Sequence, residues 1–223
     1  MRRFLQGRIA LVQALMGSSL PVTYHDLMLI LTSVISACAA WRWPGCGFDR
    51  KRFVESLIRF SSPSLHLDHI SIGAMLELGL IKECQSPWGG LGKEDRVFTG
   101  EEIDSGLSEM SDRYPLLDVR ELKKASYADT IYRWLRCGYA HTYSGAGNTT
   151  HVPPSRRPAQ VSYIGRFQTD GTLIRIASFH LDYVIEVVQE QVSSLADKQM
   201  NSPGSWWIDS TSTQTPRGCD DSL

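Results

Sequence analysis

The sequence has few cysteines, and their placement excludes two classes of protein. The five cysteines are an odd number, lie far apart, and form no Cys-x-x-Cys pair. This pattern fits neither a disulfide framework nor a structural zinc site, but it fits free thiols in a reducing compartment. We therefore expect a cytoplasmic protein. The cysteines are Cys38, Cys46, Cys84, Cys137 and Cys219.

Long apolar runs are also missing. No run reaches the roughly 18 residues that a membrane-spanning helix needs, and the best candidate, residues 27–41, is interrupted by serines and a threonine. Arg8 and Gln13 break up the N-terminal segment, so it does not fit a secretory signal. With 42% hydrophobic residues the chain can bury one sizeable core. We expect one soluble domain over residues 1–200, a disordered tail over residues 201–223, and no membrane partner.

The spacing of the apolar residues predicts a mainly α fold. Thr23 or Asp26 can cap the second predicted helix, and Asp49 can cap the third. Two strand-like runs, residues 161–166 and 172–178, are joined across Asp170-Gly171, which is a strong hairpin signal. We expect a helical bundle with an inserted β-hairpin, which is either a lid, a dimer arm or structural decoration. The predicted helices cover residues 3–16, 27–41, 50–60, 67–80, 114 into the stretch 132–143, and 179–198.

Two other segments carry little functional information. Residues 82–112 contain glycines, Pro87 and mixed charge without a clear period, so we expect a loop-rich insertion there. Pro115 suits the first turn of the helix that follows. The spacing of His66 and His69 is compatible with metal ligands, but no acidic or cysteine partner follows at the sequence spacing of a metal site. We therefore expect no bound metal.

Acidic residues are absent from residues 131–169, although this segment contains five arginines. The formal net charge of the whole chain is −1, so positive charge is concentrated here. Such a field attracts polyanions such as RNA, although a basic loop without a partner has the same composition. The basic residues of the helix predicted over residues 50–60 either form its solvated face or extend this surface. The five arginines are Arg133, Arg136, Arg156, Arg157 and Arg166.

One stretch in this segment combines an arginine with a histidine. Arg136 and His141 are five positions apart, which corresponds to about 140° around an α-helix, so they are not stacked neighbours. A guanidinium can hold a phosphate through two hydrogen bonds, and an imidazole that titrates near neutrality can transfer a proton. The pair indicates metal-free cleavage of a phosphodiester, although two solvated or packing side chains would show the same spacing.

The order Arg136-x4-His141-x-Tyr143 resembles the Arg-x4–6-His motif, with its trailing tyrosine, of the HEPN superfamily (higher eukaryotes and prokaryotes nucleotide-binding domains). Residues 135–141, LRCGYAH, are similar to the LRCGxxH form of bacterial and plasmid members. Residues 43–53 also resemble a segment of that group. Together the similarity covers residues 24–189, but only the Arg/His motif carries chemistry.

The resemblance implies a helical bundle that forms a homodimer, with two Arg/His motifs in one composite active site. Active members are metal-independent endoribonucleases that need no cofactor, and many are toxins or antiviral defence effectors with an antitoxin or defence-complex partner. By this resemblance Arg136 positions the phosphate and His141 transfers protons. Tyr143 matches the residue to which a nucleotidyltransferase antitoxin attaches AMP. The expected RNA contacts are Arg133, Arg156, Arg157 and Arg166.

Cys137 departs from the commonest family pattern, which has Asn, Asp or His directly after the arginine. The main alternative is therefore a catalytically silent HEPN-like domain that binds RNA or nucleotide, or that scaffolds a defence or toxin–antitoxin complex. A third interpretation is a regulatory helical protein that acts only through its basic surface. Substitution of Arg136 and His141 separates the first two, because only an enzyme should lose its effect.

Overall fold

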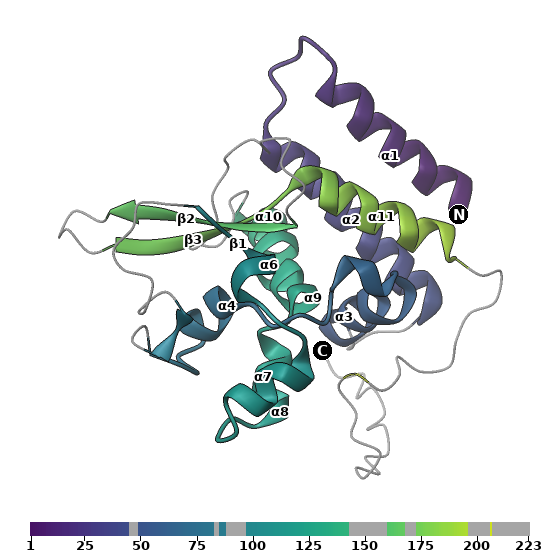
Figure 1. Ribbon diagram of the computed structural model, residues 1–223. Coiled ribbons are helices and arrows are strands. Elements are labelled where there is room, and N and C mark those ends of the chain that lie inside the picture. The colour runs from purple at the N-terminus through teal and green to yellow at the C-terminus, as the bar shows by residue number, and fades with distance from the viewer. Residues whose placement is uncertain are drawn as a thin grey trace, which may run out of the picture.

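The computed structural model describes residues 1–44, 49–82, 85–87, 97–142, 160–167, 173–195 and 206. Helices make up most of these residues, and a small antiparallel sheet lies to one side of them (Figure 1). The expected mainly α fold with a β-hairpin is therefore confirmed. The predicted turn at Asp170-Gly171 and the tail, apart from Trp206, lie outside the described residues.

The long apolar helix α2 (Tyr24–Arg42) has the most helical neighbours. Both expected caps begin it together, since the Thr23 side chain accepts the Asp26 N–H and the Asp26 carboxylate accepts the Thr23 N–H. This reciprocal arrangement satisfies two donors that a helix start leaves unpaired. Figure 1 shows α2 beside α1 (Arg2–Met16) and α11 (Leu181–Ser193), and it also packs on α3 (Asp49–Phe60).

Within the described residues, α2 is also the one helix long and apolar enough, by length and composition alone, to cross a membrane. It has 19 residues and is therefore longer than the sequence predicted. The core helix of a folded domain meets the same criterion, and 44% of the relevant window of α2 is buried against the rest of the fold. The criterion is thus weak evidence for a membrane span.

Arg42, the last residue of α2, ties this helix to α3 and α11. It is 3% exposed, and it donates to the side-chain oxygen of Gln191 at 2.7 Å and to its backbone oxygen at 2.8 Å. It also donates to Ser56 and lies 4.1 Å from the ring centre of Phe60. No carboxylate among the described residues pairs with it, and burial lowers the pKa of Arg42 to about 10. The guanidinium stays charged at neutral pH and is held by neutral dipoles.

The chain between α3 and the motif is built from shorter pieces than the sequence predicted. The 3₁₀ turn η1 (Pro63–Leu65) and the short helix α4 (Ile72–Glu77) replace a single helix over residues 67–80. His66 takes a left-handed conformation with φ of 49°, which ends η1. Ile70 then forms isolated bridges to Ser105 and Ser126, and this tertiary pairing requires extended backbone where a helix was expected.

The stretch expected to be a loop contains regular structure. It includes the strand β1 (Phe98–Thr99), the helix α6 (Gly100–Ile103) and the helix α7 (Leu107–Arg113). Phe98, Ile103 and Met110 are buried, so this segment contributes to the core. These elements are too short to show a periodic spacing of apolar residues, so they could not be predicted from the sequence.

The predicted helix from residue 114 to the motif is divided. After α8 (Val119–Lys124), the helix α9 (Tyr127–Thr130) begins anew at Ser126, whose side chain accepts the Asp129 N–H. The Ala125 carbonyl accepts the N–H of Ser71 from the neighbouring segment, so a tertiary hydrogen bond is made at the break. Pro115 lies in the turn between α7 and α8 and not in the first turn of a helix.

The sheet has the order β1-β2-β3, with all neighbours antiparallel. β2 (Val161–Phe167) and β3 (Leu173–Phe179) are the predicted hairpin strands, and β1 adds a short third strand. Phe179 ends β3 and does not begin the last helix, because it pairs with Val161. Tyr24 donates to the Phe179 carbonyl at 2.6 Å, which joins α2 to the sheet.

A buried carboxylate connects the sheet to the surrounding helices. Asp104, which follows α6, accepts from the hydroxyls of Tyr127 and Tyr163 at 2.7 Å each and from the Ile72 N–H at 2.8 Å. Burial raises the pKa of Asp104 to about 7, although these three donors act in the opposite direction. Asp104 can therefore take up a proton near neutral pH without a cationic partner.

We predict that stability depends on pH through Asp104. Its folded pKa of about 7 lies above the ordinary value of 3.8, so the folded chain binds the additional proton within this window. The contribution of Asp104 to the free energy of unfolding therefore falls as the pH rises from about 4 to about 7. Asp104→Asn, which resembles the protonated carboxyl, should flatten this slope in urea unfolding. A slope equal to that of the wild type would contradict the prediction, and Glu109→Gln, on the exposed surface, is the control.

Candidate functional site

The predicted motif lies on two consecutive helical segments. Arg136 belongs to η3 (Ile131–Cys137), which is a π-helix, and His141 belongs to α10 (Gly138–Thr142). A π-helix has wider turns than an α-helix because its hydrogen bonds link residues five apart. The α-helical angle expected from the sequence therefore does not apply within η3. Single π-helical turns are rare and occur frequently at functional sites.

The apolar side of these two segments is buried in the bundle. Trp134 and Leu135 of η3 are each 1% exposed, and Tyr139 of α10 is 2% exposed. The Tyr139 ring contacts His25 of α2 edge to face, with ring centres 5.1 Å apart. Because this side is fixed against α2, the other side is free to present polar groups to solvent.

Arg136 is held by a carboxylate from α3. Its Nη2 atom lies 2.8 Å from Asp49 Oδ2, and its guanidinium carbon lies 5.5 Å from the centre of the Tyr132 ring. The Tyr132 hydroxyl donates to the same Oδ2 atom at 3.1 Å. Arg52 approaches Asp49 Oδ1 at 3.3 Å. Arg136, Tyr132 and Asp49 therefore form a closed set of contacts in which the arginine side chain remains 25% exposed.

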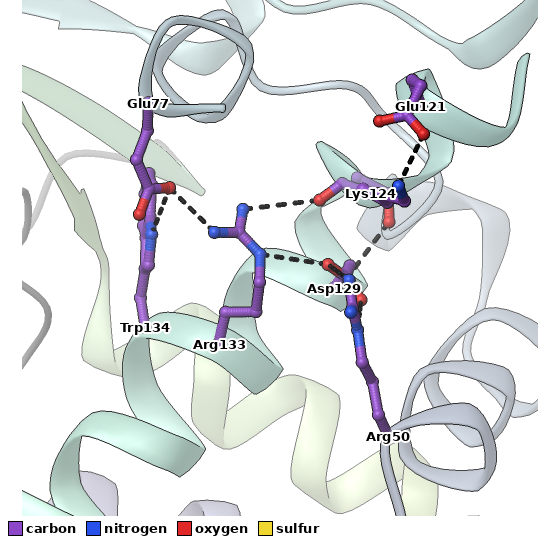
Figure 2. Close-up of polar contacts among 8 residues, drawn as sticks. Arg50, Glu77, Glu121, Lys124, Asp129, Arg133 and Trp134 are labelled. Carbon is purple, nitrogen blue, oxygen red and sulfur yellow. Dashed lines mark hydrogen bonds and ion pairs between the residues drawn. The ribbon is translucent and has the colours of Figure 1, made fainter. Parts of the chain in front are cut away.

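A second carboxylate, Asp129 of α9, fixes the helix just before the motif (Figure 2). It is fully buried and accepts from Arg50 Nε and Nη2 at 2.7 Å each and from Arg133 Nε at 3.1 Å. Arg133 also donates to Glu77 Oε2 at 2.9 Å, and Trp134 Nε1 donates to this same oxygen at 2.7 Å. The guanidinium of Arg133 is therefore engaged within the chain.

Asp49 and Asp129 form ion pairs across the same interface, but the two pairs have opposite polarity. At the start of α3, Asp49 binds a cation of η3, while the next residue, Arg50, binds an anion of α9. A shift of α3 along α9 and η3 would break both ion pairs. From the sequence, Asp49 was expected as a cap, and Arg50 either on the solvated face of the helix or on an RNA-binding surface, because local spacing cannot reveal ionic partners so distant in the chain.

The hydroxyl that supports this arrangement stays protonated. Burial raises the pKa of Tyr132, and the neighbouring Cys137 and Asp49 add to the increase. Tyr132 therefore remains a hydrogen-bond donor to Asp49 at neutral pH. Cys137, which directly follows Arg136, is half-buried and lies beside this contact.

His141 is exposed on α10, and no hydrogen bond or ion pair involves its ring within the described part of the chain. The side chains of four other predicted site residues are not among those that the structure describes. Tyr143, Arg156 and Arg157 lie outside the described residues, and for Arg166 only the backbone, in β2, is described.

The two histidines considered as metal ligands lie together. The rings of His66 and His69 have centres 4.3 Å apart, and burial lowers the pKa of His69, with His66 adding to the effect. Among the residues that the structure describes, no group of three or more histidine, cysteine, aspartate or glutamate side chains is placed to hold a metal ion.

Comparison with known proteins finds no family model, curated protein or solved structure that matches the chain. The interpretation of the site therefore depends on its own residues, their geometry and the motif.

We predict that Asp129 is a main source of local stability. Asp129→Ala leaves Arg50 and Arg133 without their shared anion, and the loss of this buried carboxylate with its charged hydrogen-bond donors should cost about 2 kcal/mol of unfolding free energy, because the arginine side chains left behind are partly exposed. The matched control is Glu109→Ala, which removes the exposed pair with Arg113 and should cost no more than about 0.5 kcal/mol. Equal losses in urea unfolding would contradict the prediction.

Proposed function

We propose that the chain is a metal-independent endoribonuclease of the HEPN type that acts in the cytoplasm as a toxin or anti-phage defence effector. The 2′-hydroxyl of RNA attacks the adjacent phosphate, leaving a 2′,3′-cyclic phosphate and a 5′-hydroxyl. The observation that carries the proposal is the Arg/His motif at the junction of η3 and α10. It combines an anchored, partly exposed guanidinium with an exposed imidazole on the next segment.

In this reaction Arg136 binds the scissile phosphate. Negative charge grows on the phosphate oxygens in the transition state, and a guanidinium already in place stabilises that charge without reorganising. Asp49 contacts only the Nη2 atom of Arg136, and no polar partner of Nε or Nη1 occurs in the described part of the chain. Two nitrogens therefore remain to hold a phosphate.

His141 supplies the proton transfers. The reaction needs a base that takes the proton of the 2′-hydroxyl and an acid that protonates the departing 5′-oxygen. One imidazole cannot hold both protonation states at the same moment. A homodimer in which two motifs share one cleft provides a neutral and a protonated histidine together, and this requirement supports the proposed composite active site.

RNA binding beyond the scissile phosphate requires further cations. Arg133 contributes least, because Glu77 and Asp129 already occupy its guanidinium. Lys51 and Arg59 of α3 are exposed and are available to a polyanion. We retain Arg156, Arg157 and Arg166 as proposed RNA contacts on the basis of the sequence alone.

Tyr143 is the proposed site of control by an antitoxin. An AMP group attached there would add negative charge near the motif and repel the RNA backbone. The test is intact mass measurement after co-expression with a nucleotidyltransferase encoded beside the protein. An unmodified Tyr143 in a complex that has lost its toxicity would eliminate this form of control.

The alternative is a catalytically silent domain that binds RNA or scaffolds a larger complex. The ion pair between Arg136 and Asp49 favours it, since the pair lowers the positive potential at the motif. Cys137 also stands where the commonest pattern has a polar residue. A silent domain would keep its biological effect in the Arg136→Ala and His141→Ala variants.

We predict that the purified protein cleaves total RNA in excess EDTA and leaves a matched DNA intact, because deoxyribose lacks the attacking hydroxyl. His141→Ala should reduce the cleavage rate by about 10²–10⁴, the usual contribution of general acid–base catalysis. The matched control is His66→Asn, since asparagine tolerates the left-handed backbone at this position and the residue lies on another segment. Equal activity of the wild type and His141→Ala would refute the assigned role.

A further inference from the structure

We propose that Asp49 is a positioning residue that orients the Arg136 guanidinium toward the phosphate and does not block it. This inference rests on the proposed function, since it concerns the arginine that would hold the scissile phosphate. The sequence motif contains no acidic residue, so Asp49 enters the site only through the fold.

The contact geometry leaves the arginine available. Asp49 Oδ2 lies 2.8 Å from Nη2 of Arg136, and the guanidinium carbon lies 5.5 Å from the centre of the Tyr132 ring. The ion pair with Asp49 and the neighbouring Tyr132 ring therefore restrict the rotation of the guanidinium. The remaining nitrogens have no polar partner among the described residues, so a phosphate can bind without displacing Asp49.

The carboxylate is itself restrained from three sides. Oδ2 accepts from the Tyr132 hydroxyl at 3.1 Å in addition to Arg136, and Oδ1 faces Arg52 Nη2 at 3.3 Å. Two cations share this one anion, so the cluster keeps a net positive charge and still attracts a phosphate. Its carboxylate is also 39% exposed, so water screens its repulsion of an incoming anion.

The backbone that carries Asp49 is held by the next residue. Arg50 makes two 2.7 Å hydrogen bonds with the fully buried Asp129, which precedes Arg136 by seven residues. This anchor fixes the start of α3 relative to η3. The Arg50–Asp129 ion pair therefore fixes the backbone position from which Asp49 contacts the partly exposed guanidinium of Arg136.

The test compares Asp49→Ala and Asp49→Asn with the wild type in steady-state cleavage of one defined RNA. Loss of orientation should lower kcat about 10–100-fold in Asp49→Ala and change KM little, because a misplaced group costs transition-state stabilisation more than ground-state binding. Asp49→Asn should recover part of kcat, since its amide oxygen still accepts a hydrogen bond. Glu109→Ala, which removes another ion-paired carboxylate, should leave both constants unchanged.

An increase of kcat/KM in either Asp49 variant would overturn the proposal and show that the carboxylate blocks the phosphate. Equal losses in kcat and in thermal stability for both variants would also overturn it, because they would indicate a purely structural role.

A second readout separates failure of this inference from failure of the proposed function. In ¹⁵N NMR of arginine side chains, the Arg136 signals, assigned with Arg136→Lys, should show hindered rotation of the guanidinium in the wild type and free rotation in Asp49→Ala. Hindered rotation in a wild-type protein that cleaves no RNA would remove the proposed function and preserve the orienting contact. Freely rotating signals in the wild type would remove the positioning role, whatever the activity.

Discussion

The site depends on the reciprocal ion pairs between the start of α3 and the helix that carries the motif. Each side of this interface carries one positive and one negative charge. Asp49 pairs with Arg136, and Arg50 pairs with Asp129. Two ion pairs of opposite polarity specify the register of α3 against the motif helix, because a displaced α3 would bring like charges together. The same interface buries Asp129 and leaves Arg136 partly exposed, so the structural ion pair and the solvent-accessible arginine lie seven residues apart.

This arrangement changes what the basic segment can do. The arginines of residues 131–169 have no acidic neighbour within that segment, yet the fold brings Asp49, Glu77 and Asp129 to Arg133 and Arg136. Arg133 is thereby a structural cation, while two nitrogens of Arg136 have no polar partner among the residues that the structure describes. For Arg133 and Arg136, whose side chains the structure describes, positive charge counted along the sequence therefore overstates the charge that is available to a polyanion.

Local signals predicted the parts of the fold that local interactions determine. The Thr23 and Asp26 cap, the amphipathic helices and the hairpin strands were recognisable because their stabilising contacts lie close in sequence. The helix predicted over residues 67–80 was wrong because Ile70 pairs with distant residues. The π-helical turn and the ionic partners of Arg136 were likewise invisible, since tertiary packing and not spacing decides them. Arg136 and His141 could be selected as candidates from the sequence, but Asp49 could not.

We propose that an oriented arginine and an accessible histidine cleave RNA through its own 2′-hydroxyl. The most direct measurement is mass spectrometry of the fragment ends produced from a defined RNA in the presence of EDTA. We expect 2′,3′-cyclic phosphate and 5′-hydroxyl ends, which should be absent from the His141→Ala reaction. Fragments with 3′-hydroxyl and 5′-phosphate ends, or cleavage that persists in His141→Ala, would contradict it.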